Sequence, residues 1–513
     1  MKTIKKLMTL VLSIAMILAM GVTAFADDAS ATSAPTITIT NAQEKHTYEA
    51  YQIFKGDLSD GVLSNIAWGD GVTEAGQVHF GNAADKAKKL GSTADAAQFA
   101  KEIGGNASNP SYLDINKGKT GTYQNGEYVI SGLEAGYYFV RDITDVDDKD
   151  DFKTAYIMKV VGMVDVTLKG DKPTLDKQIK HNENGQWGVV GDNQIGDTVE
   201  FRTITTVPDV EGYSEYVYNI HDTMSVGLTS NVQSEANITI RVNDATELGK
   251  EYYTVSVDSS NTNKFTVTVN ILKAIADNKV EKHNSLYMYY TGVLNEDAKI
   301  YDDTNQNNVA YLEYSNNPNG DEKGKTPEKK VYDWTFKIGV NKVNGGGDAL
   351  SGAKFVLSKK GNLQDSDIAD EAKLIALIKK DNGVYTVAPN GYNDSDKTYE
   401  IEAGKVVING LDDATDYYLY ETKAPDKYNK LTDPIKFTIS ATYKDAGSNY
   451  DQVTVTVDKA DSTGMEIQVV NNQGSTLPST GGMGTTIFYV VGTILVLAAV
   501  VLLITKKRMH ADK

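Results

Sequence analysis

The stretch WTFKIGVNK, residues 334–342, decides the fold of this chain. Its alternate residues are Trp334, Phe336, Ile338, Val340 and Lys342. Alternate residues of a β-strand point to the same face, so the stretch predicts a strand whose buried face ends in a lysine. Burial disfavours the charged form of a lysine amine, and an isolated amine in an apolar core is costly. The core that receives this strand must therefore contain a partner for Lys342.

The same alternation recurs along the chain, between turns rich in Gly, Asn and Asp. It is clearest in TITIT at 36–40, TVTV at 266–269 and VTVTV at 453–457. This pattern predicts an all-β fold of tandem immunoglobulin-like sandwiches. Helices are expected only at 83–90, 94–103 and 368–380. Polar breaks at 170–173 and 316–328 predict three units, at 27–170, 171–330 and 331–474.

Composition excludes several classes of function. The formal charge of −18 repels phosphate backbones, so nucleic-acid binding is not expected. The six histidines are scattered without metal-ligand spacing, and no catalytic motif stands out, so we expect no metal, no cofactor and no enzyme. The acidic run at 142–151 lacks the residue order of a calcium loop and is interpreted as a solvated loop.

The amino-terminal end has the pattern of an export signal. Lys2, Lys5 and Lys6 precede an apolar run at 7–20, and Ala24-Phe25-Ala26 provides a small-residue cleavage site. Residues 1–26 are therefore predicted to be a signal peptide. The exported chain has no cysteine, so its stability must come from something other than disulfides.

The carboxyl-terminal end, residues 475–513, combines three signals in a fixed order. The pentapeptide comes first and consists of Leu477, Pro478, Ser479, Thr480 and Gly481. An apolar run at 487–504 follows, about 27 Å long as a helix and so long enough to cross a bilayer. A basic end at 506–508 then favours the cytoplasmic side. The whole segment resembles the LPXTG sorting signal that sortases cleave between Thr480 and Gly481.

Residues whose numbers are both odd or both even share one face of a strand, and this parity argument finds partners for two inward lysines. In the third unit, Asn471 and Glu421 share the faces of apolar residues in their strands, so they are expected beside Lys342. In the second unit, Lys177, Asp222 and Asn316 are expected to point inward by the same alternation. The neighbouring asparagines, Asn472 and Asn317, are the alternatives that parity disfavours. From parity alone, each group is either a buried ion pair with an asparagine beside it or a covalent cross-link.

Motifs along the chain resemble those of Gram-positive backbone pilins. TYEAYQIFKG at 47–56 and GLEAGYY at 132–138 are similar to the N-terminal pilin domain. YNIHDTMS at 218–225 resembles the acid-bearing strand of the isopeptide-forming fimbrial domain. LSGAKF at 350–355 and YLYETKAP at 418–425 resemble a CnaB-type domain. The resemblance implies Lys177–Asn316 and Lys342–Asn471 isopeptide bonds, promoted by Asp222 and Glu421; no such trio is expected in the first unit.

The resemblance also implies how copies are joined. Backbone pilins are linked through a lysine just before the second domain, and VDVTLK at 164–169 places Lys169 there, although the usual Tyr-Pro pair is replaced by Thr167-Leu168. Lys172 and Lys180 are the weaker candidates. The implied partners are a class C pilin sortase, a housekeeping sortase, further copies of the chain, tip and base pilins, and peptidoglycan. The expected product is a head-to-tail pilus on the cell wall; a monomeric wall-anchored adhesin is the alternative.

Overall fold

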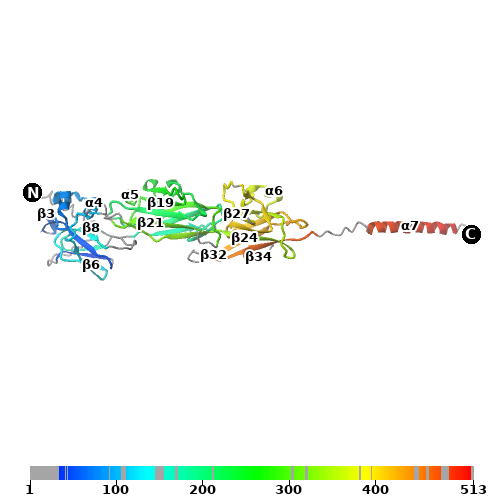
Figure 1. Ribbon diagram of the computed structural model, residues 1–513, viewed down its shortest axis with the longest axis horizontal. Helices are drawn as coiled ribbons and strands as arrows, with labels where there is room; N and C mark the ends of the chain where they lie inside the picture. Colours follow the sequence, from blue (N-terminus) through cyan, green and yellow to red (C-terminus); the bar gives the residue numbers. More distant parts are fainter. Residues whose placement is uncertain are drawn as a thin grey trace.

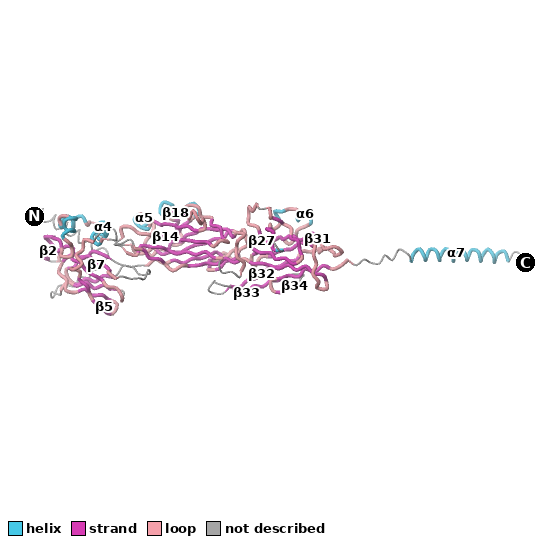
Figure 2. The backbone as a smooth tube through the Cα atoms, viewed as in Figure 1, coloured by secondary structure: helices cyan, strands magenta, loops and turns pink. Residues whose placement is uncertain are grey.

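The computed structural model arranges the chain as a row of three β-rich units followed by one long helix (Figure 1). It describes residues 34–509, except 41, 43, 60, 92, 106–110, 145–154, 168–171, 211–212, 302–305, 318–321, 381–382, 394, 444–449, 458–460 and 475–483. Each unit contains two facing sheets, and strands account for most of its regular secondary structure (Figure 2). The predicted all-β tandem fold is confirmed.

The first unit packs a four-stranded sheet, ordered β5-β6-β1-β9, against a sheet built on β3-β2-β7-β8. Its elements are β1 (Thr36–Thr40), β2 (Tyr48–Ser59), β3 (Val62–Trp68), α2 (Glu74–Phe80), α3 (Ala83–Lys89), α4 (Thr93–Gly104), β4 (Lys119–Thr120), β5 (Thr122–Gln124), β6 (Glu127–Ile130), β7 (Gly136–Asp142), β8 (Ala155–Val160) and β9 (Met163–Thr167). The helices expected at 83–90 and 94–103 are present as α3 and α4. The edge strand β9 runs parallel to β1 and ends just before the second unit.

The second unit has two sheets, ordered β11-β10-β13-β20-β16-β17 and β12-β23-β21-β14-β19-β18. Its elements are β10 (Leu175–Lys180), β11 (Trp187–Gly188), β12 (Val190–Asp192), β13 (Thr198–Thr206), β14 (Tyr218–Met224), β15 (Leu228–Ser230), η1 (Glu235–Asn237), β16 (Thr239–Val242), β17 (Thr246–Glu247), η2 (Lys250–Tyr252), β18 (Tyr253–Val257), β19 (Lys264–Val269), α5 (Ile271–Ala276), β20 (Ser285–Leu294), β21 (Asn307–Ser315), β22 (Lys323–Lys325) and β23 (Lys329–Trp334). Strands β13, β14, β20 and β21 alternate strictly between buried and outward residues. Their inward residues form the core between the sheets.

The third unit has one sheet ordered β28-β26-β27-β30-β24-β35-β34 and another ordered β29-β25-β31-β32-β33. Its elements are β24 (Phe336–Asn344), β25 (Ala353–Ser358), α6 (Asp365–Ile368), η3 (Glu371–Lys373), β26 (Leu377–Lys379), β27 (Val384–Val387), β28 (Lys397–Thr398), β29 (Ile401–Ala403), β30 (Lys405–Leu411), β31 (Asp416–Lys423), β32 (Ile435–Tyr443), β33 (Tyr450–Val457), β34 (Asp461–Thr463) and β35 (Glu466–Asn471). Strand β24 lies between β30 and β35 and runs parallel to β35. The beginning and end of the unit are thus adjacent strands.

Two local predictions in this region need correction. The stretch 334–342 is not one strand, because Trp334 ends β23 of the second unit and Phe336 begins β24 of the third. Both side chains are nevertheless buried, as the alternation predicted. The helix expected at 368–380 is wrong: it is replaced by two short helical turns and by β26, where buried Leu377 and Ile378 pair with β27. Strand pairing across the sheet outweighed the local helical pattern there.

The second and third units meet through the loop that follows β12. The Ile195 backbone nitrogen donates to the Gly410 oxygen at 3.1 Å, and the Tyr417 hydroxyl donates to the Gln194 side-chain oxygen at 3.1 Å. Ile195 is fully buried against Gly410, which has a φ of +88°. A Cβ atom added at Gly410 would lie 2.5 Å from the Ile195 Cδ1 atom. The junction therefore depends on the absence of a side chain at this glycine.

The long helix α7 (Gly484–Met509) lies beyond the third unit at the carboxyl-terminal end (Figure 1). Within its segment Ile487–Arg508, an 18-residue window has a mean hydropathy of 3.0, and that window is not buried against the rest of the chain. By length and composition the helix can cross a membrane. Its last turn carries the basic residues Lys506, Lys507 and Arg508.

We predict that Gly410→Ala loosens the junction between the second and third units. The variant incurs the strain of a positive φ, about 1–2 kcal/mol, together with a steric clash against Ile195. Gly391→Ala is the matched control, because Gly391 has a φ of +80° and open space around its Cα atom. Limited proteolysis and thermal melting of the exported domain should show that Gly410→Ala loses more protease resistance and has a lower melting temperature than Gly391→Ala. Equal losses in the two variants would contradict the proposed junction packing.

Candidate isopeptide sites and wall anchor

Lys342 and Asn471 are in contact at the centre of the third unit, with Glu421 beside them. Lys342 lies on β24, Asn471 on the parallel neighbour β35, and Glu421 on β31 of the facing sheet. The Lys342 amine donates to the Asn471 side-chain oxygen and, at 2.9 Å, to the Val469 backbone oxygen. The Asn471 side-chain nitrogen donates to the two Glu421 oxygens at 3.0 and 2.9 Å. The three predicted side chains therefore meet, with the amine against the amide carbonyl.

This site is closed to solvent, because Lys342, Glu421 and Asn471 are each at most 3 % exposed. Burial lowers the pKa of the Lys342 amine to about 8, against the opposing effect of the Glu421 carboxylate, whose Oε1 atom lies 3.9 Å from Nζ. A larger fraction of the amine is thus neutral near physiological pH than in an exposed lysine, and the neutral amine is the nucleophilic form. Asn472, the neighbouring alternative, is exposed.

The second unit holds a similar group between its two sheets. Lys177 on β10 and Tyr290 on β20 belong to one sheet, and Asp222 on β14 and Asn308 on β21 belong to the other. The Lys177 amine lies 2.5 Å from the Asp222 Oδ2 atom and also donates to the Tyr290 hydroxyl. The Asn308 side-chain nitrogen donates to the same hydroxyl at 3.3 Å. Amine, acid and amide are again brought together at one point.

Desolvation dominates the electrostatics of this second group. Lys177, Asp222, Tyr290 and Asn308 are each at most 3 % exposed. Burial lowers the pKa of the Lys177 amine and raises the pKa of the Asp222 carboxyl, although the attraction between them opposes both shifts. The pair is therefore pushed toward a neutral amine and a protonated acid, the forms that acyl transfer to an amine requires.

The structure does not bring Asn316 to Lys177. Asn316 follows the end of β21, is only half-buried, and its backbone nitrogen donates to the Glu322 oxygen at 3.4 Å. Asp222 lies opposite Ala310, so Asn316 is about 20 Å further along the strand direction. Asn317 is equally removed, and its side chain contacts Glu322. The asparagine beside the Lys177 amine is Asn308.

The parity argument chose the correct face but the wrong end of the strand. Asn308, Ala310, Leu312 and Tyr314 all point inward, as predicted for even-numbered residues of this strand. Parity does not fix position along a strand, because that depends on the register of antiparallel pairing. Tyr290 was missed altogether. The signal that could have found it is the inward alternation of β20, which places a hydroxyl among the buried residues of YMYYTGVL.

The first unit lacks a comparable group among its described residues. Apart from tyrosines, its buried titratable side chains there are His46 and Asp142, whose Nδ1 and Oδ2 atoms are 2.5 Å apart. Lys45 is exposed, and Lys55 forms an exposed ion pair of 2.7 Å with Asp70. Neither of these two lysines is available to a buried asparagine.

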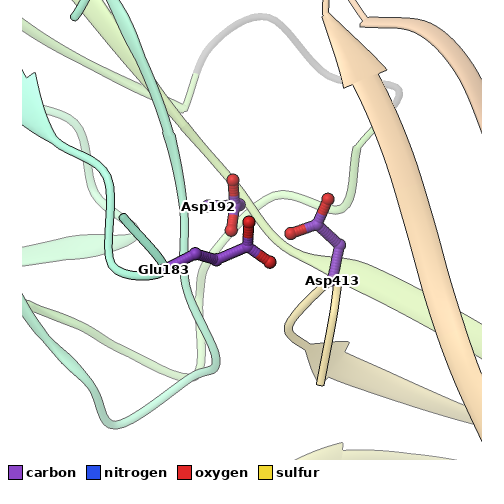
Figure 3. Close-up of side chains that lie close together, drawn as sticks. All are labelled: Glu183, Asp192 and Asp413. Carbon is purple, nitrogen blue, oxygen red and sulfur yellow. The ribbon is translucent and has the colours of Figure 1, made fainter. Parts of the chain in front are cut away.

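An acidic cluster lies at the junction of the second and third units. Glu183, Asp192 and Asp413 direct their carboxylates toward one another (Figure 3), with one oxygen of each within 4.8 Å of the others. Burial raises the pKa of the neighbouring Asp333 and Asp412 carboxyls to about 7. Oxygen ligands of this type could hold a hard divalent cation. No spacing in the sequence indicated the cluster, because its members come from two units.

Four predicted features lie wholly or mostly outside the described residues. They are the signal peptide at 1–26, the linking lysine Lys169, the pentapeptide Leu477–Gly481, and the acidic run at 142–151, of which 145–151 are not described. Lys169 falls between β9 and β10, and the pentapeptide falls between β35 and α7. The candidate Lys172 is exposed, and Lys180 forms an ion pair of 2.7 Å with Glu200.

Known proteins resemble this chain over most of its length. It is 25 % identical over 367 residues to the trypsin-resistant surface T6 protein of Streptococcus pyogenes serotype M6; the match covers 61 % of this chain and 65 % of that protein, slightly less than two thirds. The solved T6 backbone pilin has 15 % identity and a TM-score of 0.47, covering 87 % of this chain and all of that one. The major pilin SpaD of Corynebacterium diphtheriae has 17 % identity and a TM-score of 0.41, covering 87 % of this chain and 99 % of that one.

Two family matches cover the carboxyl-terminal part of the chain. Residues 336–473 match the SpaA family of prealbumin-like fold domains, and residues 469–510 match the LPXTG cell wall anchor motif. The first match spans the third unit from β24 to β35, and the second spans the pentapeptide and α7. This chain is therefore an LPXTG-anchored surface protein of the cell wall whose third unit is a prealbumin-like domain.

Proposed function

We propose that this chain is the structural backbone subunit of a sortase-assembled pilus. A pilin sortase cleaves after Thr480, and the Thr480 carbonyl is then joined to the Lys169 amine of the next copy. A housekeeping sortase attaches the finished fibre to peptidoglycan, and accessory pilins occupy its tip and base. The anchor match and the 25 % identity to the surface T6 protein support this assignment.

The observation that carries the proposal is the pair of buried lysines, each beside an asparagine and an acid. In each group the neutral amine attacks the asparagine side-chain carbonyl carbon, a new amide bond forms, and ammonia leaves. The acid beside each asparagine assists by polarising the carbonyl or by carrying protons, so no external enzyme is required. The joined pairs are Lys177 with Asn308, promoted by Asp222, and Lys342 with Asn471, promoted by Glu421.

These bonds suit the path that tension takes through a polymer joined at Lys169 and Thr480. Force enters just before β10, crosses from Lys177 to Asn308, and continues through β21, β22 and β23 into β24. It then crosses from Lys342 to Asn471 and leaves toward Thr480. The strands between the bonded residues are bypassed in both units. The first unit precedes Lys169 and lies outside this path, in keeping with the absence of a buried lysine among its described residues.

Each bond also stabilises its unit at rest. It closes a loop of about 130 residues, and by the chain-entropy treatment used for disulfides this contributes about 5 kcal/mol. A chain without cysteine thus has two covalent cross-links that no change in redox conditions can open.

We predict that the mature exported domain is lighter than its sequence mass by two molecules of ammonia. Asn308→Ala should prevent the loss of one of these ammonia molecules. It should also lower the free energy of unfolding of the second unit by about 5 kcal/mol. Asn316→Ala is the matched control and should still lose both ammonia molecules. Intact-mass spectrometry measures all three proteins. A wild-type domain at its full sequence mass would overturn both cross-links. If Asn316→Ala lost only one ammonia molecule, the choice of Asn308 would be overturned.

We also predict that boiled cell-wall extracts contain a high-mass ladder of this protein when its pilin sortase is present. Lys169→Ala should collapse the ladder to monomer because the accepting amine is gone, whereas Lys172→Ala should retain it. Immunoblotting of the extracts measures both. A ladder that persists in Lys169→Ala but disappears in Lys172→Ala would reassign the linking lysine. A single wall-bound monomer in the wild type would instead support an anchored adhesin.

A further inference from the structure

The Tyr290 hydroxyl occupies the centre of the second-unit group. It accepts hydrogen bonds from the Lys177 amine and from the Asn308 side-chain nitrogen, and it donates to the Asp222 Oδ2 atom. The ring is fixed by Phe201, stacked at a centroid distance of 5.7 Å, and by Phe265, edge-on at 5.2 Å. One hydroxyl therefore contacts both the Lys177 nitrogen, which would enter the new amide, and the Asn308 nitrogen, which would leave it.

Amide transfer between these groups requires a proton to move between the two nitrogens. The bond from Lys177 Nζ to the Asn308 Cγ atom forms, and the bond from Cγ to Nδ2 breaks. Attack by a neutral amine leaves Nζ with one proton too many, whereas Nδ2 must gain one proton to leave as ammonia. Nothing is oxidised or reduced, so a proton carrier between the two nitrogens completes the reaction.

We propose that Tyr290 is a catalytic residue that carries this proton, an inference that rests on the proposed Lys177–Asn308 bond. Its oxygen accepts the proton from Nζ as its own proton turns from Asp222 to Nδ2, so the phenol is regenerated in one step. Asp222 is thereby left to donate to the Asn308 carbonyl oxygen. In the structure that oxygen accepts no hydrogen bond from a described residue, and so it is available for this contact.

In the third unit, a single residue, Glu421, lies near both the Lys342 and the Asn471 nitrogens. Both Glu421 oxygens already contact the Asn471 nitrogen, and one of them lies 3.9 Å from the Lys342 amine. In the described part of that unit, no tyrosine hydroxyl hydrogen-bonds to Lys342, Glu421 or Asn471. The longer glutamate side chain can thus serve both nitrogens by itself. The same chain therefore contains one centre that uses Tyr290 and one that does not, and the second is an internal control.

The test follows bond formation during refolding of chain recovered unfolded from inclusion bodies. Samples are quenched in acid, digested, and analysed by mass spectrometry for the two branched peptides, Lys177–Asn308 and Lys342–Asn471. Tyr290→Phe retains the ring and removes the hydroxyl, and should slow the first bond about a hundredfold, within the range for a lost acid–base group, without slowing the second. Tryptophan fluorescence recorded in parallel gives the rate of folding, so that each bond rate is compared with it.

Tyr218→Phe is the matched variant. Tyr218 is buried in the same core and on the same strand as Asp222, but its hydroxyl donates to the Thr206 backbone oxygen at 2.9 Å. It should form both bonds at the wild-type rate. Equal rates for Tyr290→Phe and wild type, or an equal slowing by Tyr218→Phe, would overturn the role of Tyr290 while the bond itself stands. A wild-type chain that never yields the Lys177–Asn308 peptide would overturn the proposed bond, and the relay with it.

Discussion

An amine held out of water beside a carboxylic acid and a primary amide is the constraint on which the second and third units depend. In water, Lys177 and Lys342 would be charged and inert toward an amide. Inside the two sandwiches, desolvation lowers the pKa of each amine, and in the second unit it also raises the pKa of Asp222. Both lowered values favour the uncharged amine, which reduces the cost of burying the lysine and is also the nucleophilic form.

The strand order of each unit determines what a cross-link would join. In the third unit Lys342 and Asn471 lie on parallel neighbours, so the bond would join the start of the domain to its end within one sheet. In the second unit Lys177 and Asn308 lie on opposite sheets, so the bond would pass through the core. In the third unit the bonded residues lie close to where the chain enters and leaves. In the second unit Lys177 lies near the entry, whereas the rest of β21, then β22 and β23, still follow Asn308 before the chain leaves at Trp334.

Alternation of side chains made much of this structure predictable. It identified the sandwich fold, the inward lysines, both acids and Asn471, because each depends only on which face of a strand a residue occupies. It did not find Asn308, because the register between β14 and β21 is set by pairing across the sheet. It also missed Tyr290 and the acidic junction formed by Glu183, Asp192 and Asp413. These features form where residues of separate strands or separate units come together. A local sequence pattern does not predict which distant residues will be neighbours.

The central claim is that tension bypasses the strands that lie between the bonded residues of the second and third units. Single-molecule stretching of the chain, held at residues 172 and 474, tests it most directly. Each bypassed segment contains about 130 residues, which would add roughly 45 nm if it were drawn out to full length. We expect no extension step of that size before the attachment to the instrument fails. Steps near 45 nm in the wild-type chain would show that the strands carry the load themselves and would contradict the covalent path.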